Sequence, residues 1–107
     1  VPTLLKILKK PGWGRNKIDL KKDAIRSLGE IRSVDAVPIL EKIVATRSFL
    51  HRSRCNELRV AAASALGDIG DDAARDTLER ATQDKSTAVV RAAYQAIKQL
   101  TRENNER

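Results

Sequence analysis

The sequence predicts an all-α protein, an α-solenoid (superhelix) built from three antiparallel helix pairs. Three observations predict this fold: a helical segment that recurs three times, a shorter helical segment before each copy, and a composition poor in aromatic residues. Trp13, Phe49 and Tyr94 are the only Trp, Phe and Tyr residues among 107. Because sheets favour aromatic and β-branched side chains, this composition favours closely packed helices.

The recurring segment is the second helix of each predicted pair. Residues 20–31 align with residues 58–69 and with residues 89–100. The matched apolar positions follow the spacing i, i+4, i+7, i+8 and i+11, which places them on one face of a helix. The faces expected to be buried are Leu20, Ala24, Ser27, Leu28 and Ile31; Leu58, Ala62, Ala65, Leu66 and Ile69; and Val89, Ala93, Ala96, Ile97 and Leu100.

A shorter helical segment precedes each copy and completes the pair. Residues 1–8 align with residues 37–44, and residues 40–42 align with residues 78–80. The helix ends are predicted from residues that favour first turns and caps. These are Pro2 and Pro38 in first turns, Asp35 and Asp72 before the first helices, Asn56 and either Ser86 or Thr87 before the second helices, and Gly70 at a C-terminus.

The string from Leu58 to Gly70, Leu-Arg-Val-Ala-Ala-Ala-Ser-Ala-Leu-Gly-Asp-Ile-Gly, resembles the HEAT repeat, in particular HEAT-like repeats of phycobilisome-lyase type. The first repeat departs from the pattern at Ser27, and the third has Lys98 in place of the helix-end glycine. The resemblance implies an α-solenoid whose second helices line a concave surface that binds proteins or, less often, nucleic acid. We expect one domain over residues 1–102, with repeats of about 1–33, 34–70 and 71–102, and a polar tail over 103–107.

Composition and charge indicate the cellular environment of this domain and the kind of partner it would attract. Hydrophobic residues make up 41% and charged residues 33%, with no apolar run long enough to span a membrane, so we expect a soluble protein. One cysteine and no signal-peptide pattern favour the cytoplasm. The absence of methionine and the apolar start predict missing upstream sequence. Lys and Arg outnumber Asp and Glu nine to four over residues 1–36, so an acidic partner is expected near that end.

The connections inside the first two pairs are the candidate binding site. The third pair has a short link, residues 83–87, whereas residues 9–17 and 47–56 form longer ones, and insertions at equivalent points of a solenoid project from one edge. Both combine basic and aromatic side chains, which suit phosphate, carboxylate or stacked bases. The candidate binding residues are Trp13, Arg15, Lys17, Lys21, Lys22, Phe49, His51, Arg52, Arg54 and Arg59. The alternative is that Trp13 and Phe49 fold back to fill gaps at the edge, with the cations merely solvated.

No residue pattern indicates chemistry. His51 and Cys55 are four residues apart, but a single His and a single Cys provide neither a four-ligand zinc site nor a catalytic group with an orienting partner. The acidic residues Asp68, Asp71 and Asp72 fit helix capping better than a calcium loop. We therefore expect no enzymatic activity, catalytic residue, metal, cofactor or small-molecule substrate.

The function predicted from the sequence is a protein-protein interaction scaffold, a module of a larger protein. The alternative is nucleic-acid binding through the basic N-terminal edge, which steep salt dependence would reveal. A tetrapyrrole-handling accessory role is suggested by the name of the related repeat alone, since no residue argues for it.

Overall fold

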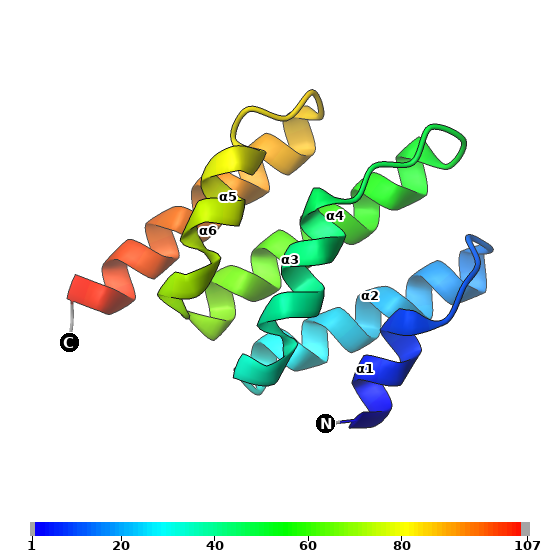
Figure 1. Cartoon of the computed structure of the whole chain (residues 1–107), viewed down its shortest axis with the longest axis horizontal. Helices are drawn as coiled ribbons and strands as arrows, with labels where there is room; N and C mark the ends of the chain where they lie inside the picture. Colours follow the sequence, from blue (N-terminus) through cyan, green and yellow to red (C-terminus); the bar gives the residue numbers. More distant parts are fainter. Residues whose placement is uncertain (1, 106–107) are drawn as a thin grey trace.

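The computed structural model describes residues 2–105, and its fold is the α-solenoid that the repeat predicts. Within those residues, six α-helices follow one another as three antiparallel pairs (Figure 1). The helices are α1 (Pro2–Lys9), α2 (Arg15–Glu30), α3 (Val37–Ala45), α4 (Arg52–Ile69), α5 (Arg75–Ala81) and α6 (Thr87–Asn105), and 3-10 turns η1 (Val34–Ala36) and η2 (Asp72–Ala74) precede α3 and α5.

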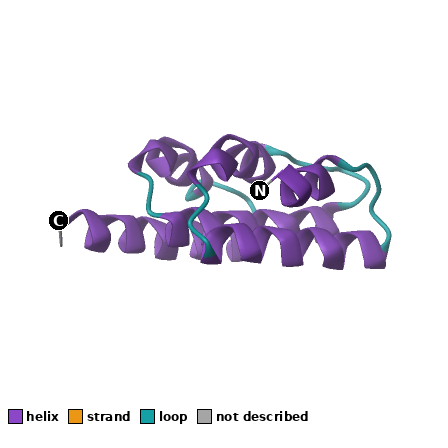
Figure 2. Ribbon diagram, turned by 90° about the horizontal axis from the view of Figure 1, so that it is seen from below, coloured by secondary structure: helices purple, strands orange, loops and turns teal. Residues whose placement is uncertain are grey.

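The helices form two layers (Figure 2). The long second helices α2, α4 and α6 lie side by side in one layer, and the short first helices α1, α3 and α5 form the other. The molecule measures 41 × 32 × 16 Å, and the thin dimension fits two layers of helices packed 8–10 Å apart. All three connections inside the pairs therefore emerge along one edge, at the N-termini of the second helices (Figure 1).

Neighbouring second helices approach through a glycine on one and an alanine on the next. A Cβ at Gly29 would lie 3.1 Å from the Ala65 Cα, and a Cβ at Gly67 would lie 2.9 Å from the Ala96 Cα. A Cβ at Gly67 would force the Ala96 backbone to shift, and a Cβ at Gly29 would require Ala65 to give by a few tenths of an ångström, so the close approach of the helices favours glycine at both positions. Fully buried large side chains surround these contacts: Ile18, Ile25, Leu28, Leu40, Val44, Leu66, Leu78, Val89 and Leu100.

The predicted buried faces are correct in the second repeat and wrong at two positions in the first. Leu20 is 49% exposed and Ile31 is 54% exposed, whereas the matched Leu58 and Ile69 are 6% and 5% exposed. The difference arises because α4 has α2 on that side, while no described helix lies beyond α2. Two further matched positions are partly buried, namely Ser27 and Ile97.

Two of the predicted caps are present. Gly70 ends α4 in the left-handed conformation, with φ of 76°, and its N–H donates to the Leu66 carbonyl oxygen. The Ser86 Oγ precedes α6 and accepts a hydrogen bond of 3.4 Å from the Val89 N–H. Both contacts satisfy backbone groups that have no partner within the helix.

Three other predicted caps are wrong. Asp35 and Asp72 lie inside η1 and η2, because a 3-10 turn occupies the place where each first helix was expected to begin. Asp71 is the capping residue instead, accepting from the Ala73 N–H at 3.0 Å. Asn56 lies within α4, whose N-cap position is His51, five residues before the expected cap.

The helix boundaries differ from the prediction at the C-terminal end as well. The expected tail over residues 103–107 continues as helix α6 up to Asn105. The parts of the predicted first repeat and tail at residues 1, 106 and 107 lie outside the described residues.

Gly67→Ala tests the close approach of α4 and α6. Alanine is favoured over glycine by about 1 kcal/mol in a helix, but here its Cβ would meet the Ala96 backbone. We expect the free energy of unfolding to fall by roughly 1–3 kcal/mol, as measured by urea denaturation. Ser64→Ala, at an exposed position of the same helix, is the matched control and should leave stability unchanged or slightly higher. Equal or greater stability of Gly67→Ala would contradict this packing.

Candidate functional site

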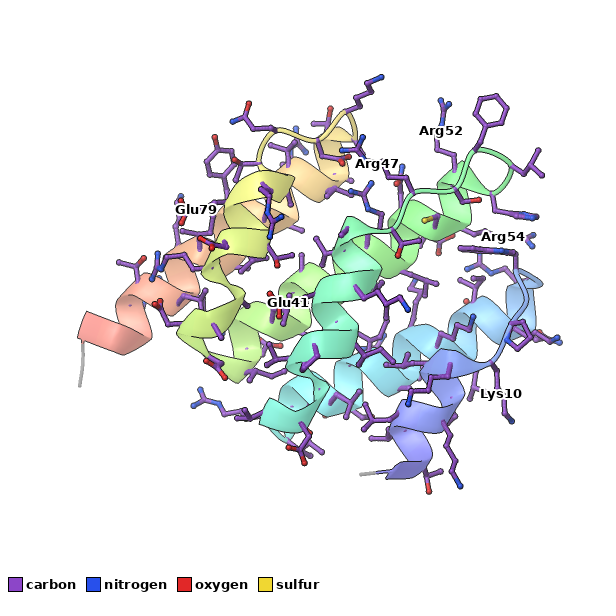
Figure 3. The ribbon with its side chains drawn as sticks, viewed as in Figure 1. Lys10, Glu41, Arg47, Arg52, Arg54 and Glu79 are labelled. Atoms are coloured by element: carbon purple, nitrogen blue, oxygen red, sulfur yellow. The ribbon has the colours of Figure 1, made fainter. Side chains whose placement is uncertain are left out.

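The first two connections, residues 10–14 and 46–51, lie side by side, which confirms the prediction that they are neighbours. The Trp13 and His51 rings stack, with centroids 5.2 Å apart and planes inclined by 11°. Arg54, on the first turn of α4, donates a hydrogen bond to the Trp13 carbonyl oxygen (Figure 3). These two contacts join the first pair to the second at the edge.

Both connections are shorter than predicted, because α2 and α4 begin earlier in the sequence. Gly12 has φ of 121° and the following chain is extended at Gly14, so helix α2 begins directly afterwards. In the second connection, the His51 N–H donates to the Ser48 Oγ at 3.1 Å, and the helix follows without an intervening Gly or Pro. Four candidate residues thus lie on first turns of helices instead of in loops: Arg15, Lys17, Arg52 and Arg54.

Trp13 folds back onto the protein. Its side chain is partly buried and packs against the hydrophobic core. The Lys21 Nζ lies 5.9 Å from the Trp13 ring centroid and donates to the Gly12 carbonyl oxygen at 3.4 Å. Burial, together with the nearby Lys17 charge, lowers the pKa of Lys21. For Trp13 the gap-filling alternative therefore describes what the structure shows.

Phe49 behaves differently from Trp13. It is 86% exposed, and its neighbour Leu50 is 84% exposed, at the tip of the second connection. Two adjacent large apolar side chains that no other part of the described chain covers form an apolar spot on a charged edge. We refer to Phe49 and Leu50 as the apolar tip.

Glu57 pairs with two of the candidate cations. Its carboxylate receives two hydrogen bonds from the Arg15 guanidinium, at 2.9 and 3.1 Å, and one from the Lys22 Nζ at 3.1 Å. The hydrogen bonds from Arg15 and then Lys22 lower the pKa of Glu57 to about 2. Hydrogen bonding to Glu57 in turn raises the pKa of Arg15. Arg15 and Lys22 therefore join the first repeat to the second.

Asp84 pairs with two further cations in the same way. Arg59 is buried, donates its Nε–H to the Val44 carbonyl oxygen at 2.7 Å, and contacts the Asp84 carboxylate at 2.5 Å. Arg47 contacts the same carboxylate at 3.2 Å. The Arg59 hydrogen bonds hold the pKa of Asp84 below its ordinary value. Because its Nε, Nη1 and Nη2 atoms all donate to groups of the protein, Arg59 joins the second repeat to the third.

The structure thus divides the ten candidate residues by their engagement. Arg15, Lys22 and Arg59 are paired with carboxylates, while Arg54 and Lys21 donate to backbone oxygens. The rings of Trp13 and His51 are stacked on each other. Exposed side chains with no hydrogen bond or ion pair to another described residue remain at three positions: Lys17, Phe49 and Arg52.

An open cleft of about 560 Å³ lies between the second and third connections. The apolar tip forms part of one wall through Phe49, and the paired Arg59 and Asp84 lie at its base. Figure 3 shows Arg47 and Arg52 at this edge. The full lining is Arg47, Ser48, Phe49, Arg52, Asn56, Arg59, Asp84, Lys85 and Ser86.

Sequence reasoning missed the third connection as part of this cleft. Asp84, Lys85 and Ser86 belong to the short link, which its length distinguishes from the two longer connections that make up the predicted site. Leu50 was also absent from the candidate residues. Its signal was available, because Phe49 and Leu50 are consecutive large apolar residues in a segment predicted to be a loop.

A second hollow of about 540 Å³ runs along the second helices, where the family resemblance places a binding surface. Its walls carry small and polar side chains, with Val60 as the largest apolar one. It therefore offers less apolar area to a partner than the apolar tip does. The lining residues are Lys22, Ser53, Asn56, Glu57, Val60, Ala61, Ser64, Ser86 and Ala88.

His51 and Cys55 do not form a reactive pair. The His51 ring lies against Trp13, and the buried Cys55 donates its S–H to the Thr46 carbonyl oxygen at 3.4 Å. Burial raises the pKa of Cys55, which disfavours the nucleophilic thiolate. Over residues 2–105 no cluster of three His, Cys, Asp or Glu side chains is arranged to hold a metal ion. No helix of that part combines the length and apolar character that a bilayer crossing requires.

Comparison with known proteins gives two family matches. The model for HEAT repeats matches residues 45–106, and the model for the PBS lyase HEAT-like repeat matches residues 20–46. Together these matches extend from α2 to α6. A search of curated proteins finds no match to the chain.

Glu57→Gln tests the ion pairs between the first and second repeats. The pKa of Glu57 falls from its ordinary 4.5 to about 2, so the ionised carboxylate stabilises the fold above pH 4.5, and this contribution is lost as the pH falls from about 5 to 2. At pH 7 we expect the variant to have a lower Tm than the parent, corresponding to a loss of roughly 1 kcal/mol or less in the free energy of unfolding, because the pairs are partly exposed. Near pH 2 the two Tm values should match. Glu79→Gln, at an exposed unpaired position, is the control. A melting difference independent of pH would contradict the role of the Glu57 charge.

Proposed function

Because the chain belongs to the HEAT repeat family, we propose that it is a non-enzymatic scaffold that binds an acidic segment of a partner protein, with an apolar side chain anchored beside Phe49. HEAT repeats are generally protein-interaction scaffolds. The single observation that carries the finer proposal is the apolar tip, which stands exposed next to an open cleft. Aromatic side chains with adjacent arginines are the residues that contribute most to protein interfaces.

The charge of the cleft favours an acidic partner. Arg52 and Lys85 line it without an ion pair to any described residue, and Arg47 is largely exposed although it contacts Asp84. The net charge of the chain is +7, which draws acidic segments toward it over longer distances. Carboxylates of a partner would meet Arg52 and Lys85 while its apolar side chain covers Phe49.

The nucleic-acid alternative gains less support from the arrangement. Phosphate binding requires several free cations along one track, but Arg15, Lys22 and Arg59 are already held by carboxylates. Asp84, at the base of the cleft, is already paired with Arg59 and Arg47, so neither of these two cations is unpaired when a phosphate approaches. Stacking of bases on Trp13 is blocked on one face by His51.

Selection from a displayed library of random peptides tests the proposal with the full chain. We expect enriched peptides to combine Asp or Glu with a large apolar residue. For one enriched peptide, Phe49→Ala and Arg52→Ala should each weaken Kd by about tenfold, measured by fluorescence anisotropy. Val34→Ala and Arg91→Ala, an exposed apolar and an exposed cationic position outside the cleft, are the matched controls and should leave Kd unchanged.

Three outcomes would overturn the proposal. Enrichment of peptides without acidic residues would remove the charge argument. Equal binding by Phe49→Ala and the parent chain would exclude Phe49 of the apolar tip from the binding site. Tight binding of a 20-base-pair DNA duplex, with affinity falling steeply as salt rises, would favour the nucleic-acid alternative instead.

A further inference from the structure

The side of α2 that faces away from α4 carries exposed apolar residues at the positions used for stacking. Leu20 and Ile31 match Leu58 and Ile69 of the second repeat, which the preceding pair covers. They also match Val89 and Leu100 of the third repeat, which are fully buried. The same face is therefore buried twice in this chain and exposed once. The exposed copy has the residues of an interface but no helix against it among the described residues.

Ser27 shows where a glycine of another helix would lie. The matched Ala65 and Ala96 each contact the glycine of the preceding second helix, Gly29 and Gly67 respectively. Ser27 is partly buried, and its side chain is only slightly larger than the alanine found at the two matched positions. A helix placed on α2 in the same register would bring its own glycine to Ser27.

The first helices repeat the pattern with a polar contact. The Thr77 Oγ1 on α5 donates to the Glu41 carboxylate on α3 at 2.6 Å, joining two successive first helices. Figure 3 shows Glu41 on α3, the middle one of the three. The alignment of the first helices places Thr3 at the position of Thr77, and Thr3 is exposed at the start of α1. A first helix with a glutamate at the Glu41 position would meet Thr3 in the same way.

The opposite side of the stack lacks these features. On α6 the position of Gly29 and Gly67 is held by Lys98, an exposed charged residue. Arg91 and Tyr94 are also exposed on that helix. A helix approaching α6 as closely as α6 approaches α4 would meet the Lys98 side chain, so the two outer sides of the described solenoid are not equivalent.

We propose that the outer side of α2, together with the start of α1, is a docking surface for a further helix pair of the same repeat kind, joined N-terminally to α1. Its second helix packs on Leu20, Ser27 and Ile31 with a glycine opposite Ser27. Its first helix offers an acceptor to Thr3. This surface lies on a different side of the molecule from the apolar tip, and the proposal does not depend on the proposed function.

The test adds such a pair to the full chain. A copy of residues 34–74 is fused directly before Val1, which reproduces the link that joins α4 to α5 in the chain. Residues 30, 68 and 99 occupy equivalent positions in the three repeats, and Gln99 donates to Asp68 of the preceding repeat. Residue 68 of the added copy would therefore face Glu30, so the copy carries Asp68→Asn to avoid two facing carboxylates. We expect the fused chain to unfold in one transition with a Tm at least about 5 °C higher. The amides of α2 should also exchange more slowly with solvent.

Leu20→Gln with Ile31→Gln provides the discriminating variant. In the fused chain the double change should abolish the rise in Tm and the slower exchange, whereas in the parent chain it should change Tm by no more than about 2 °C, because both side chains are half exposed. Two transitions, an added pair that stays unfolded by circular dichroism, or a gain in Tm that survives the double change would each overturn the proposal. A parent chain that sediments as a dimer, and as a monomer with the double change, would assign this surface to a second copy instead.

Discussion

The close approach of α2, α4 and α6 is the constraint on which the rest of the structure depends. A helix pair of this size cannot bury its own apolar face, so each second helix must lie on the next. The contacts of Gly29 with Ala65 and of Gly67 with Ala96 set how near the helices come and at what register. Because the register is the same at both interfaces, the N-termini of the second helices align, and the three connections meet along one edge. The candidate site is therefore a consequence of the packing.

At the basic edge, a carboxylate of each later helix pair forms ion pairs with cations of the pair before it. Glu57 of the second pair holds two cations of the first, Arg15 and Lys22, and Asp84 of the third pair holds Arg59 and Arg47 of the second. Some of the basic residues near the N-terminal end thus stabilise the contact between repeats through ion pairs. The contact of Arg59 with Asp84 satisfies two buried charged side chains, and the Arg59 Nε–H also donates to the Val44 carbonyl oxygen. The contacts of Glu57 lie at the surface and are partly exposed.

The sequence predicts the fold well and the site in part, for different physical reasons. Periodic apolar residues report burial on a helix face, so the helix pairs follow from the repeat. Leu20 and Ile31 were assigned wrongly because burial there depends on place in the stack, which the repeat does not encode. Trp13 and Phe49 lie in similar basic segments, yet one packs on the core and the other is exposed. The pairings of Arg15 with Glu57 and of Arg59 with Asp84 join residues distant in sequence, and no local pattern indicates them.

The more side chains of the edge are already held in place, the smaller is the entropic cost of ordering them when a partner binds. The Arg59 and Asp84 contact fixes the base of the cleft before any partner arrives. The Trp13 and His51 stack, the Arg54 contact and the Glu57 ion pairs fix the neighbouring part of the edge. What remains to be fixed is the apolar tip and the long side chains of Arg52 and Lys85, which lose rotamer freedom when they are contacted. A partner that covers Phe49 with an apolar side chain gains the hydrophobic term and limits the ordering cost to a few side chains. A purely ionic partner would order the same side chains without that gain, so the arrangement favours segments in which acidic and apolar residues occur together.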